Sequence, residues 1–211
     1  MTADRAQRQM AAALARDLDA GFEQFVVTYQ DRIYGFVLNL VGRAAIADEI
    51  AQETFVAAYR ALRGYSPARR RTLSLRAWLY TIALNRVRNL ARSSGRTVTL
   101  DGAAYEIADP QAGPAERAER SESARELRGA LQRLPLNYRA PVVLRHVDGR
   151  SYDEIAGILA EPVGTVKSNV HRGVALLRAE LAHLHPTRSI YALRPSRKTH
   201  ASESRGSVRA K

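Results

Sequence analysis

Apolar residues in this chain recur at steps of three and four positions, and this spacing constrains the possible folds more than any other feature. Between residues 22 and 40 the positions that follow it are Phe22, Phe25, Val26, Tyr29, Ile33, Phe36, Val37 and Leu40. Because an α-helix completes a turn in about 3.6 residues, these side chains share one face. We therefore expect a helix here that buries this face against its neighbours.

Similar spacing predicts further helices near residues 44–62, 75–93, 115–134, 137–147, 151–160 and 163–184. Gly64, Pro67 and an Arg-rich run interrupt the pattern at 64–74, where we expect a basic loop. The segment 96–115 loses the helical period and gains Gly, Pro and Asp, which indicates a flexible linker. We predict an all-α fold with two small helical domains, at 20–95 and 116–185, after an N-terminal segment at 1–19.

The two ends of the chain and its composition exclude several classes of protein. Residues 186–211 carry seven basic groups, one acid and few large apolar residues, which predicts a disordered basic tail. The longest apolar runs fall far short of the roughly 20 residues that cross a bilayer, and residues 1–10 lack the apolar segment of a signal peptide. We expect a cytoplasmic protein without membrane insertion. The lack of cysteine excludes disulfides and thiolate metal sites.

The charge of the chain is positive and unevenly distributed. The formal net charge is +12, and 30 of the 33 basic residues are arginine, whose planar group suits phosphates and base edges. Between Thr54 and Leu100 there are ten arginines and no acid. A general excess of arginine would scatter these residues evenly, and this is not observed. The clustering predicts a polyanionic partner.

The stretch "GRSYDEIAGILAEPVGTVKSNVHRG", residues 149–173, predicts two helices joined by a tight turn. Gly149 can end the preceding helix in the left-handed conformation, and Ser151 with Glu154 forms a Ser-x-x-Glu capping box. Pro162 suits the start of the following helix. The inward stripe of that helix is Val163, Val166, Val170, Val174 and Leu177.

This arrangement is typical of a helix-turn-helix unit, whose second helix enters the major groove of DNA. The residues predicted to point outward, and so to bind DNA, are Thr165, Lys167, Ser168, Asn169, His171 and Arg172. Lysine and arginine can bind phosphates or guanine edges, and asparagine can bind adenine with two hydrogen bonds. The alternative is an ordinary helical hairpin with a solvated polar face.

Four ordered stretches carry a resemblance to a known family. They are "ADEIAQETFVAAYRAL" (47–62), "LRAWLYTIALNRVRNLAR" (75–92), "LQRLPLNYRAPVVLRHVDGRSYDEIAGIL" (131–159) and "PVGTVKSNVHRG" (162–173). The chain resembles bacterial RNA polymerase sigma factors of the extracytoplasmic-function (ECF) group. The resemblance implies that 20–95 is sigma domain 2, which binds core polymerase and opens the minus-ten promoter element. It likewise implies that 116–185 is sigma domain 4, which reads the minus-thirty-five element.

The resemblance also assigns residues to these partners. Asp48, Glu49, Gln52 and Glu53 match the acidic and amide face that docks on the clamp coiled coil of the largest polymerase subunit, although a solvated helix face is the alternative. The residues expected to bind minus-ten DNA are Asn85, Arg86, Arg88, Asn89 and Arg92, together with Arg69, Arg70 and Arg71 of the basic loop. The loop corresponds to a segment that cradles an extruded base, so Tyr65 could stack on a base or pack on the domain.

The sequence departs from the family pattern at several positions. The loop at 64–74 is longer and more basic than usual, and Asn89 stands where aspartate is common. The usual "KSRLHRAR" appears as "KSNVHRGV", which puts Asn169 and Val174 in place of two arginines. Pro141 replaces a usual glutamate, and we expect it early enough in its helix to spare a backbone hydrogen bond.

We therefore interpret the chain as a sigma factor that directs promoter-specific initiation and has no catalytic activity of its own. A conventional helix-turn-helix activator or repressor is the alternative, although it has no need of the first domain. No phosphate-binding loop or paired acid site appears, and His183 and His185 lack partners for a metal, so we expect no cofactor and no metal. An anti-sigma protein is a plausible partner by resemblance. The tail could add nonspecific DNA affinity or be inert.

Overall fold

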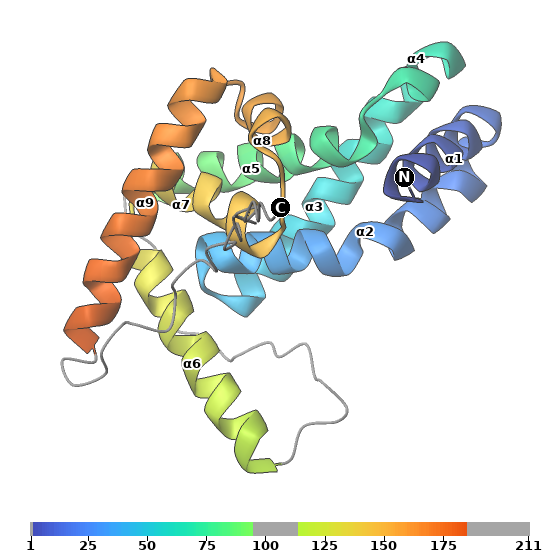
Figure 1. Ribbon diagram of the computed structural model, residues 1–211. Coiled ribbons are helices and arrows are strands. Elements are labelled where there is room, and N and C mark those ends of the chain that lie inside the picture. The colour runs from blue at the N-terminus through green and yellow to red at the C-terminus, as the bar shows by residue number, and fades with distance from the viewer. Residues whose placement is uncertain (1, 95–113, 185–211) are drawn as a thin grey trace, which may run out of the picture.

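The computed structural model describes residues 2–94 and 114–184, and every regular element in these ranges is a helix. The N-terminal block comprises α1 (Thr2–Arg16), α2 (Leu18–Val41), α3 (Ala44–Arg63), α4 (Pro67–Thr72) and α5 (Leu75–Ser94). The C-terminal block comprises α6 (Pro114–Arg133), α7 (Leu136–Val142), the π-helical turn η1 (Val143–Val147), α8 (Tyr152–Leu159) and α9 (Val163–Leu184). Figure 1 shows the two blocks side by side. The predicted linker and tail lie outside the described residues, except for the N-terminus of α6.

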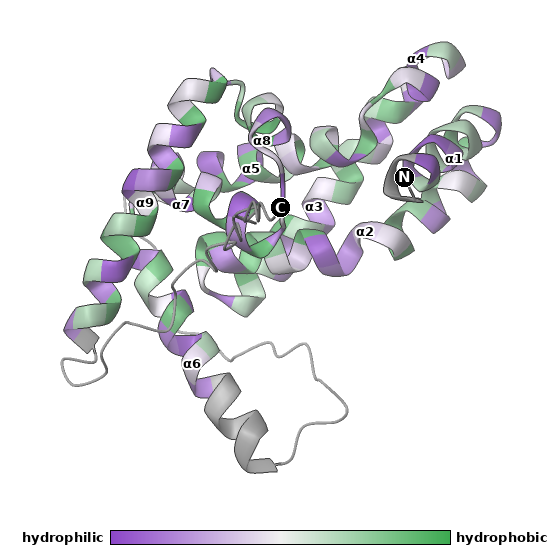
Figure 2. Ribbon diagram, in the orientation of Figure 1, coloured by the Kyte–Doolittle hydropathy of each residue, from purple (hydrophilic) through white to green (hydrophobic). Residues whose placement is uncertain are grey.

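Local sequence explains where several helices begin and end. The Asp17 carboxylate caps α2 by accepting hydrogen bonds from the backbone N–H groups of Asp19 (3.0 Å) and Ala20 (3.2 Å). Gly42 ends α2 with a φ of 74°, a left-handed conformation that glycine adopts without steric cost. Most of these helices bury an apolar stripe, whereas the short helix α4 has no buried residue. Figure 2 shows apolar and polar residues interspersed along the coloured helices.

The N-terminal block contains two helices that were not predicted from the sequence. Residues 2–16 form the helix α1, although no helix was predicted there, and its buried residues include Met10, Ala11 and Leu14. The basic loop expected at 64–74 contains the short helix α4, because Ser66 accepts a hydrogen bond from the Arg69 N–H (3.3 Å) and Pro67 occupies the first turn. Helix α1 packs against both α2 and α4, so it supports the Arg-rich helix α4.

Pro141 is not placed as expected. Helix α7 begins at Leu136, and the Arg139 N–H already donates to the Pro135 carbonyl (2.9 Å), so Pro141 lies beyond the first turn. Because proline has no N–H, it removes a regular helical hydrogen bond instead of sparing one. The chain then widens into η1, where the Asp148 N–H donates to the Val143 carbonyl (3.1 Å) five residues earlier.

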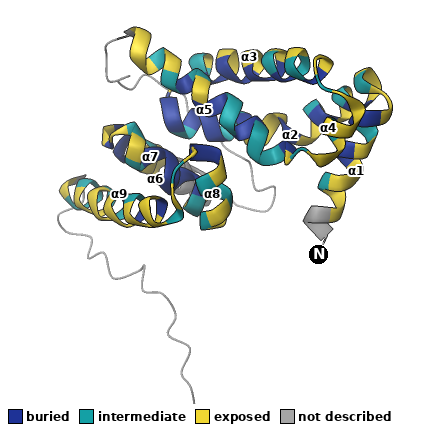
Figure 3. Cartoon of the chain, turned by 90° about the horizontal axis from the view of Figure 1, so that it is seen from above, coloured by how far each residue is buried: buried dark blue, intermediate teal, exposed yellow. Residues whose placement is uncertain are grey.

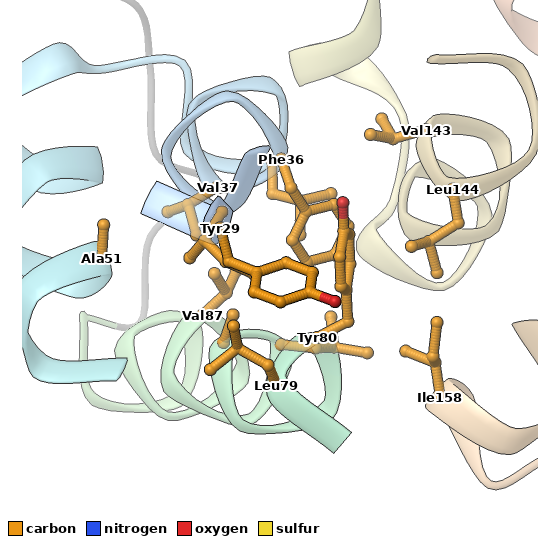
Figure 4. Packing of buried hydrophobic residues seen from close by; sticks show 14 of the residues in the cluster. Tyr29, Phe36, Val37, Ala51, Leu79, Tyr80, Val87, Val143, Leu144 and Ile158 are labelled. Carbon is orange, nitrogen blue, oxygen red and sulfur yellow. The ribbon is translucent and has the colours of Figure 1, made fainter. Parts of the chain in front are cut away.

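One hydrophobic cluster runs through both blocks. It joins residues of α2, α3 and α5 to residues of α7, η1, α8 and α9. Figure 4 shows Tyr80 of α5 between Phe36 of α2 and the side chains of Leu144 and Ile158, and the rings of Phe36 and Tyr80 lie 4.8 Å apart between centroids. The two predicted domains are therefore packed on each other in this structure.

Polar contacts reinforce this packing at the C-terminal end of α2. The Gln132 amide donates from Nε2 to the Asn39 carbonyl (2.8 Å), and Arg139 donates from Nη1 to the Leu40 carbonyl. Arg139 is 8% exposed and also binds the Gln132 side chain and the carbonyls of Gln132 and Leu134. The last carbonyls of a helix lack partners within the helix, so the C-terminal block supplies donors for α2. Burial lowers the pKa of Arg139 to about 10, which leaves it charged at neutral pH.

Candidate polymerase and nucleic-acid interfaces

Helices α8 and α9 form the predicted helix-turn-helix unit. Both hydrogen bonds of the predicted capping box are present, from Glu154 N–H to Ser151 Oγ (3.2 Å) and from Ser151 N–H to Glu154 Oε2 (2.9 Å). Gly149 has a φ of 65°, as its predicted left-handed conformation requires. Ala160 ends α8 with a φ of 56°, a region that alanine rarely occupies. The turn to α9 is thus held by local contacts and is three residues long, 160–162.

The outer face of α9 carries the residues predicted to bind DNA and forms the reading face of the helix-turn-helix unit. Val166 and Val170 are buried against the block, whereas Thr165, Lys167, Ser168, His171 and Arg172 are exposed and Asn169 is half-buried. Figure 3 shows that exposed residues predominate along α9, which lies at the edge of the molecule. The structure therefore places the whole predicted set on the first three turns of one exposed helix.

Three of these side chains are already oriented by neighbours. Ser168 donates from Oγ to the Gly164 carbonyl (3.0 Å), and the Lys167 ammonium lies 5.7 Å from the centroid of the Tyr152 ring. Asn169 donates from Nδ2 to Glu161 Oε2 (3.2 Å). Glu161 lies in the turn between α8 and α9, and its separation of eight positions from Asn169 gives no sign of this contact in the sequence.

Gly173 is a second residue whose role the sequence did not reveal. It is buried where α9 passes α7, and a Cβ atom added there would lie 2.5 Å from Val142 Cγ2 and 3.0 Å from the Tyr138 carbonyl oxygen. Val174 beside it is half-buried against the core. Gly173 thus permits a close approach of α9 to α7, and Val174 adds apolar surface beside it.

The acidic and amide residues predicted to bind polymerase lie on the exposed face of α3. Asp48, Glu49, Gln52 and Glu53 are all exposed, and Gln52 Nε2 donates to Asp48 Oδ2 (3.0 Å). Asp48 and Gln52 border a groove of about 770 Å³ between α2 and α3. The groove has an apolar floor with a polar rim, and its other lining residues are Val26, Gln30, Asp31, Tyr34, Ala44, Ala45, Ala51 and Phe55. This arrangement suits a basic helical partner with an apolar ridge.

The three arginines of the α4 segment occupy different environments. Arg71 is exposed, whereas Arg70 donates from Nε to the Leu62 carbonyl (2.9 Å) and from Nη1 to the Leu14 carbonyl (3.2 Å). Arg70 thereby ties α4 to α1 and α3. The Arg69 guanidinium carbon lies 3.7 Å from the centroid of the Tyr65 ring, and that ring packs 6.1 Å from Trp78. Tyr65 is half-buried, so the structure favours packing for it over a free stacking position.

The residues predicted to bind DNA on α5 form a polar row, but two of its arginines, Arg86 and Arg88, are only partly exposed to solvent. Asn85, Asn89 and Arg92 are exposed, and Arg92 donates to Asn89 Oδ1. Arg88 is half-buried, and Arg86 Nη1 forms an ion pair with Glu53 Oε2 on α3 (3.4 Å). Glu53 and Arg86, predicted for different partners, therefore contact each other. The strongest pKa shifts lie elsewhere, at Tyr80 and Asp148 between the two blocks.

Among residues 2–94 and 114–184, no group of three or more His, Asp or Glu side chains could hold a metal ion. His183 is exposed on the last turn of α9, and His185 lies outside the described residues. No helix in the described ranges is both long and apolar enough to span a bilayer.

Comparisons with known proteins match the two blocks. The family model described as sigma-70 region 2 matches residues 25–97, and that described as sigma-70 region 4 matches residues 124–177. The chain is 32% identical to the RNA polymerase sigma-H factor of Pseudomonas aeruginosa over 82% of this chain and 92% of that protein. It is 34% identical to the ECF RNA polymerase sigma-E factor of Escherichia coli, over 72% of this chain and 81% of that protein.

The fold is also found among solved structures. One similar structure is that of CnrH in complex with the cytosolic domain of CnrY. Its sequence is 28% identical to this chain, the TM-score is 0.62, and the superposition covers 84% of this chain and 98% of that chain. The two matched regions include the α3 face, the α5 row and the α9 reading face described above. This chain belongs to the ECF group of RNA polymerase sigma factors, the subunits that bind core polymerase and direct promoter-specific transcription.

Proposed function

We propose that three separate surfaces of this sigma factor bind three different partners: core polymerase, the minus-ten element and the minus-thirty-five element. The exposed face of α3 and the adjoining groove bind core polymerase. The polar row of α5, with Arg69 and Arg71, binds the minus-ten element as it opens, and α9 reads the minus-thirty-five element. The observation that supports this most directly is the position of Asp48 and Gln52 on the rim of an apolar groove, because an autonomous repressor has no use for such a surface.

The α5 surface suits single-stranded DNA through charge rather than through a deep pocket. Arg92, Arg88 and Asn85 can contact phosphates and exposed base edges without excluding any one base. Arg70 is left out of this surface, because it donates to two backbone carbonyls within the N-terminal block. The free energy that opens the promoter DNA then comes from binding alone, so the chain acts as a non-catalytic subunit. Its place of action is that of the polymerase, the cytoplasm.

A protein regulator is part of the same proposal. CnrH, a structural neighbour, was solved with the cytosolic domain of CnrY. The sigma factor RpoE of Bartonella quintana was solved with the anti-sigma factor NepR. We infer that this chain binds a protein of the anti-sigma class as well. The groove of about 770 Å³ between α2 and α3 offers such a protein the same apolar floor that it offers polymerase. Competition between a purified candidate regulator and core polymerase would test this inference, and simultaneous binding of both would contradict it.

The polymerase surface can be tested by reversing one charge. Asp48→Lys places a cation where a basic helix is expected, so the variant should bind core polymerase at least about tenfold more weakly, with a reduced dependence on salt. Glu23→Lys makes the same change at an exposed position of α2 outside the groove and serves as the control. Equal affinities of both variants, measured by fluorescence anisotropy with labelled sigma factor, would exclude this surface.

A further inference from the structure

A single contact in the helix-turn-helix unit connects the turn to the reading face. Asn169 Nδ2 lies 3.2 Å from Glu161 Oε2, and both side chains are half-buried. Residues 165 and 169 are four positions apart and lie in one row along α9, whereas Glu161 stands in the turn, two residues before the helix begins. Side chains on a helix lean toward its N-terminus, which brings the Asn169 amide back toward the turn. Glu161 stands at the end that enters the groove in this motif.

The contact fixes the direction of the Asn169 amide. A free asparagine can rotate its side-chain amide by half a turn and thereby exchange its donor and its acceptor. An ionised carboxylate only accepts hydrogen bonds, so Glu161 selects the orientation in which the amide nitrogen faces it. One N–H and the carbonyl oxygen of Asn169 then stay available. Adenine offers an N6 donor and an N7 acceptor in the major groove, which such an amide can bind together.

We propose that Glu161 determines specificity at one position of the minus-thirty-five element by holding the Asn169 amide in the orientation that selects adenine, an assignment that rests on the proposed role of α9. Glu161 is a positioning residue here, because it acts through Asn169. Asparagine at this position replaces a usual arginine of the family pattern, and a flexible, always cationic arginine needs no such partner.

The same carboxylate has an opposite effect on overall affinity. A negative charge beside the reading face repels the DNA backbone, and it partly offsets the attraction from the exposed Lys167 and Arg172. Removing the charge should therefore strengthen binding to DNA of any sequence while it weakens the preference for one base. A purely structural role for Glu161 predicts the reverse for affinity, because a disturbed turn would weaken binding to all sequences.

The test uses the full chain assembled with core polymerase on promoters whose minus-thirty-five region is randomised. Wild type, Glu161→Gln, Asn169→Ala and the double variant are compared by sequencing the bound DNA and by transcript yield. With wild type, adenine should be preferred by about tenfold at one position, and this preference should be lost in Asn169→Ala. Glu161→Gln should reduce this preference to about threefold or less at the same position and raise retention at high salt. The double variant should lose no more preference than Asn169→Ala alone.

Asp153→Asn is the matched control, since it removes an exposed acid from the neighbouring helix α8. It should raise affinity without changing any base preference. An unchanged adenine preference in Glu161→Gln, or losses at different positions in the two single variants, would overturn the role of Glu161 while leaving the role of α9 intact. A wild-type holoenzyme that transcribes without any minus-thirty-five preference would instead overturn both. Unchanged thermal unfolding of Glu161→Gln confirms that the turn stays folded.

Discussion

Asp148 is a buried carboxyl group between the two blocks, and its ionisation opposes their packing. Burial raises its pKa to about 7, although Arg150, Tyr80 and Arg32 favour the charged form. Burial and Asp148 also raise the pKa of the Tyr80 hydroxyl. The Tyr80 hydroxyl lies near enough to Asp148 to favour its carboxylate, but among the described residues neither this hydroxyl nor Asp148 Oδ2 has a partner in full hydrogen-bond geometry. The neutral form of Asp148 therefore suits the packed structure better than the carboxylate.

This burial predicts how stability depends on pH. Because the folded pKa is about 7 and the ordinary value is 3.8, the contribution of Asp148 is most favourable below about pH 4 and is lost as the pH rises to 7. Asp148→Asn removes this loss, so its advantage over wild type should grow between pH 5 and 8, by at most about 3 kcal/mol. Urea unfolding followed by circular dichroism at several pH values measures the difference. A constant difference across this range would contradict the shifted pKa.

The contrast between Asp148 and Ser151 shows which residues a sequence can assign. Ser151 and Glu154 contact each other within one helical turn, so their spacing alone predicted the capping box, and the structure confirms it. Asp148 and Arg70 owe their roles to helices far away in the chain, and no local pattern encodes those distances. The exposed set on α9 was predictable because a helix has two faces, whereas the Glu161 contact required the conformation of the turn.

At the scale of elements, backbone features decide how α7 and α9 pack. The helical periodicity of 137–147 was interpreted as one regular helix, but Pro141 removes a hydrogen bond and η1 follows it. Periodicity could not reveal this change, because residues in α- and π-helical turns show similar short-range spacing. Helix α1 was missed although Met10 and Leu14 are spaced as a helix requires, since its small alanine residues give a weak apolar pattern.

Gly173 provides a test of the close contact between α9 and α7. Gly173→Ala would place a Cβ atom 2.5 Å from Val142 Cγ2 and 3.0 Å from the Tyr138 carbonyl oxygen, which forces the helices apart. Although alanine favours helix more than glycine, the crowding should dominate and lower the free energy of unfolding by about 1 to 3 kcal/mol. Gly157→Ala on α8 is the control, because nothing lies within 4 Å of an added Cβ, and it should stabilise. Equal stabilisation of both variants in thermal unfolding would exclude the close approach.

At the scale of the whole molecule, the packing of the two blocks conflicts with the proposed contacts on DNA. The minus-ten and minus-thirty-five elements are about 25 base pairs apart, or about 85 Å along the duplex. Helix α5 contacts α8 directly, and Thr81 on α5 donates from Oγ1 to the Ile158 carbonyl (3.3 Å). The α5 and α9 surfaces cannot reach both elements while these contacts persist. We therefore expect the closed arrangement to open before the proposed contacts with both elements form.

Gln132 offers the cleanest way to weaken this closed arrangement. Gln132→Met keeps the side-chain volume but removes the amide that donates to the Asn39 carbonyl and accepts from Arg139 Nη1. The bonds from Arg139 to the carbonyls of Leu40 and Leu134 stay. Leaving a buried carbonyl without a donor costs about 1 to 3 kcal/mol, so the ratio of closed to open molecules should fall at least about fivefold. The lack of native cysteine allows labels at two introduced sites, for example Val27→Cys on α2 and Ala175→Cys on α9, both exposed.

Distances between these labels, measured by double electron–electron resonance on the free chain, should show a larger long-distance population in Gln132→Met than in wild type. The variant should also saturate promoter-specific transcription at a lower concentration, because less free energy is spent on opening. Gln24→Met, the same substitution at an exposed site of α2, is the control and should change neither result. Identical distance distributions in the two variants would mean that the apolar cluster around Tyr80 and Leu144 holds the blocks together without help from Gln132.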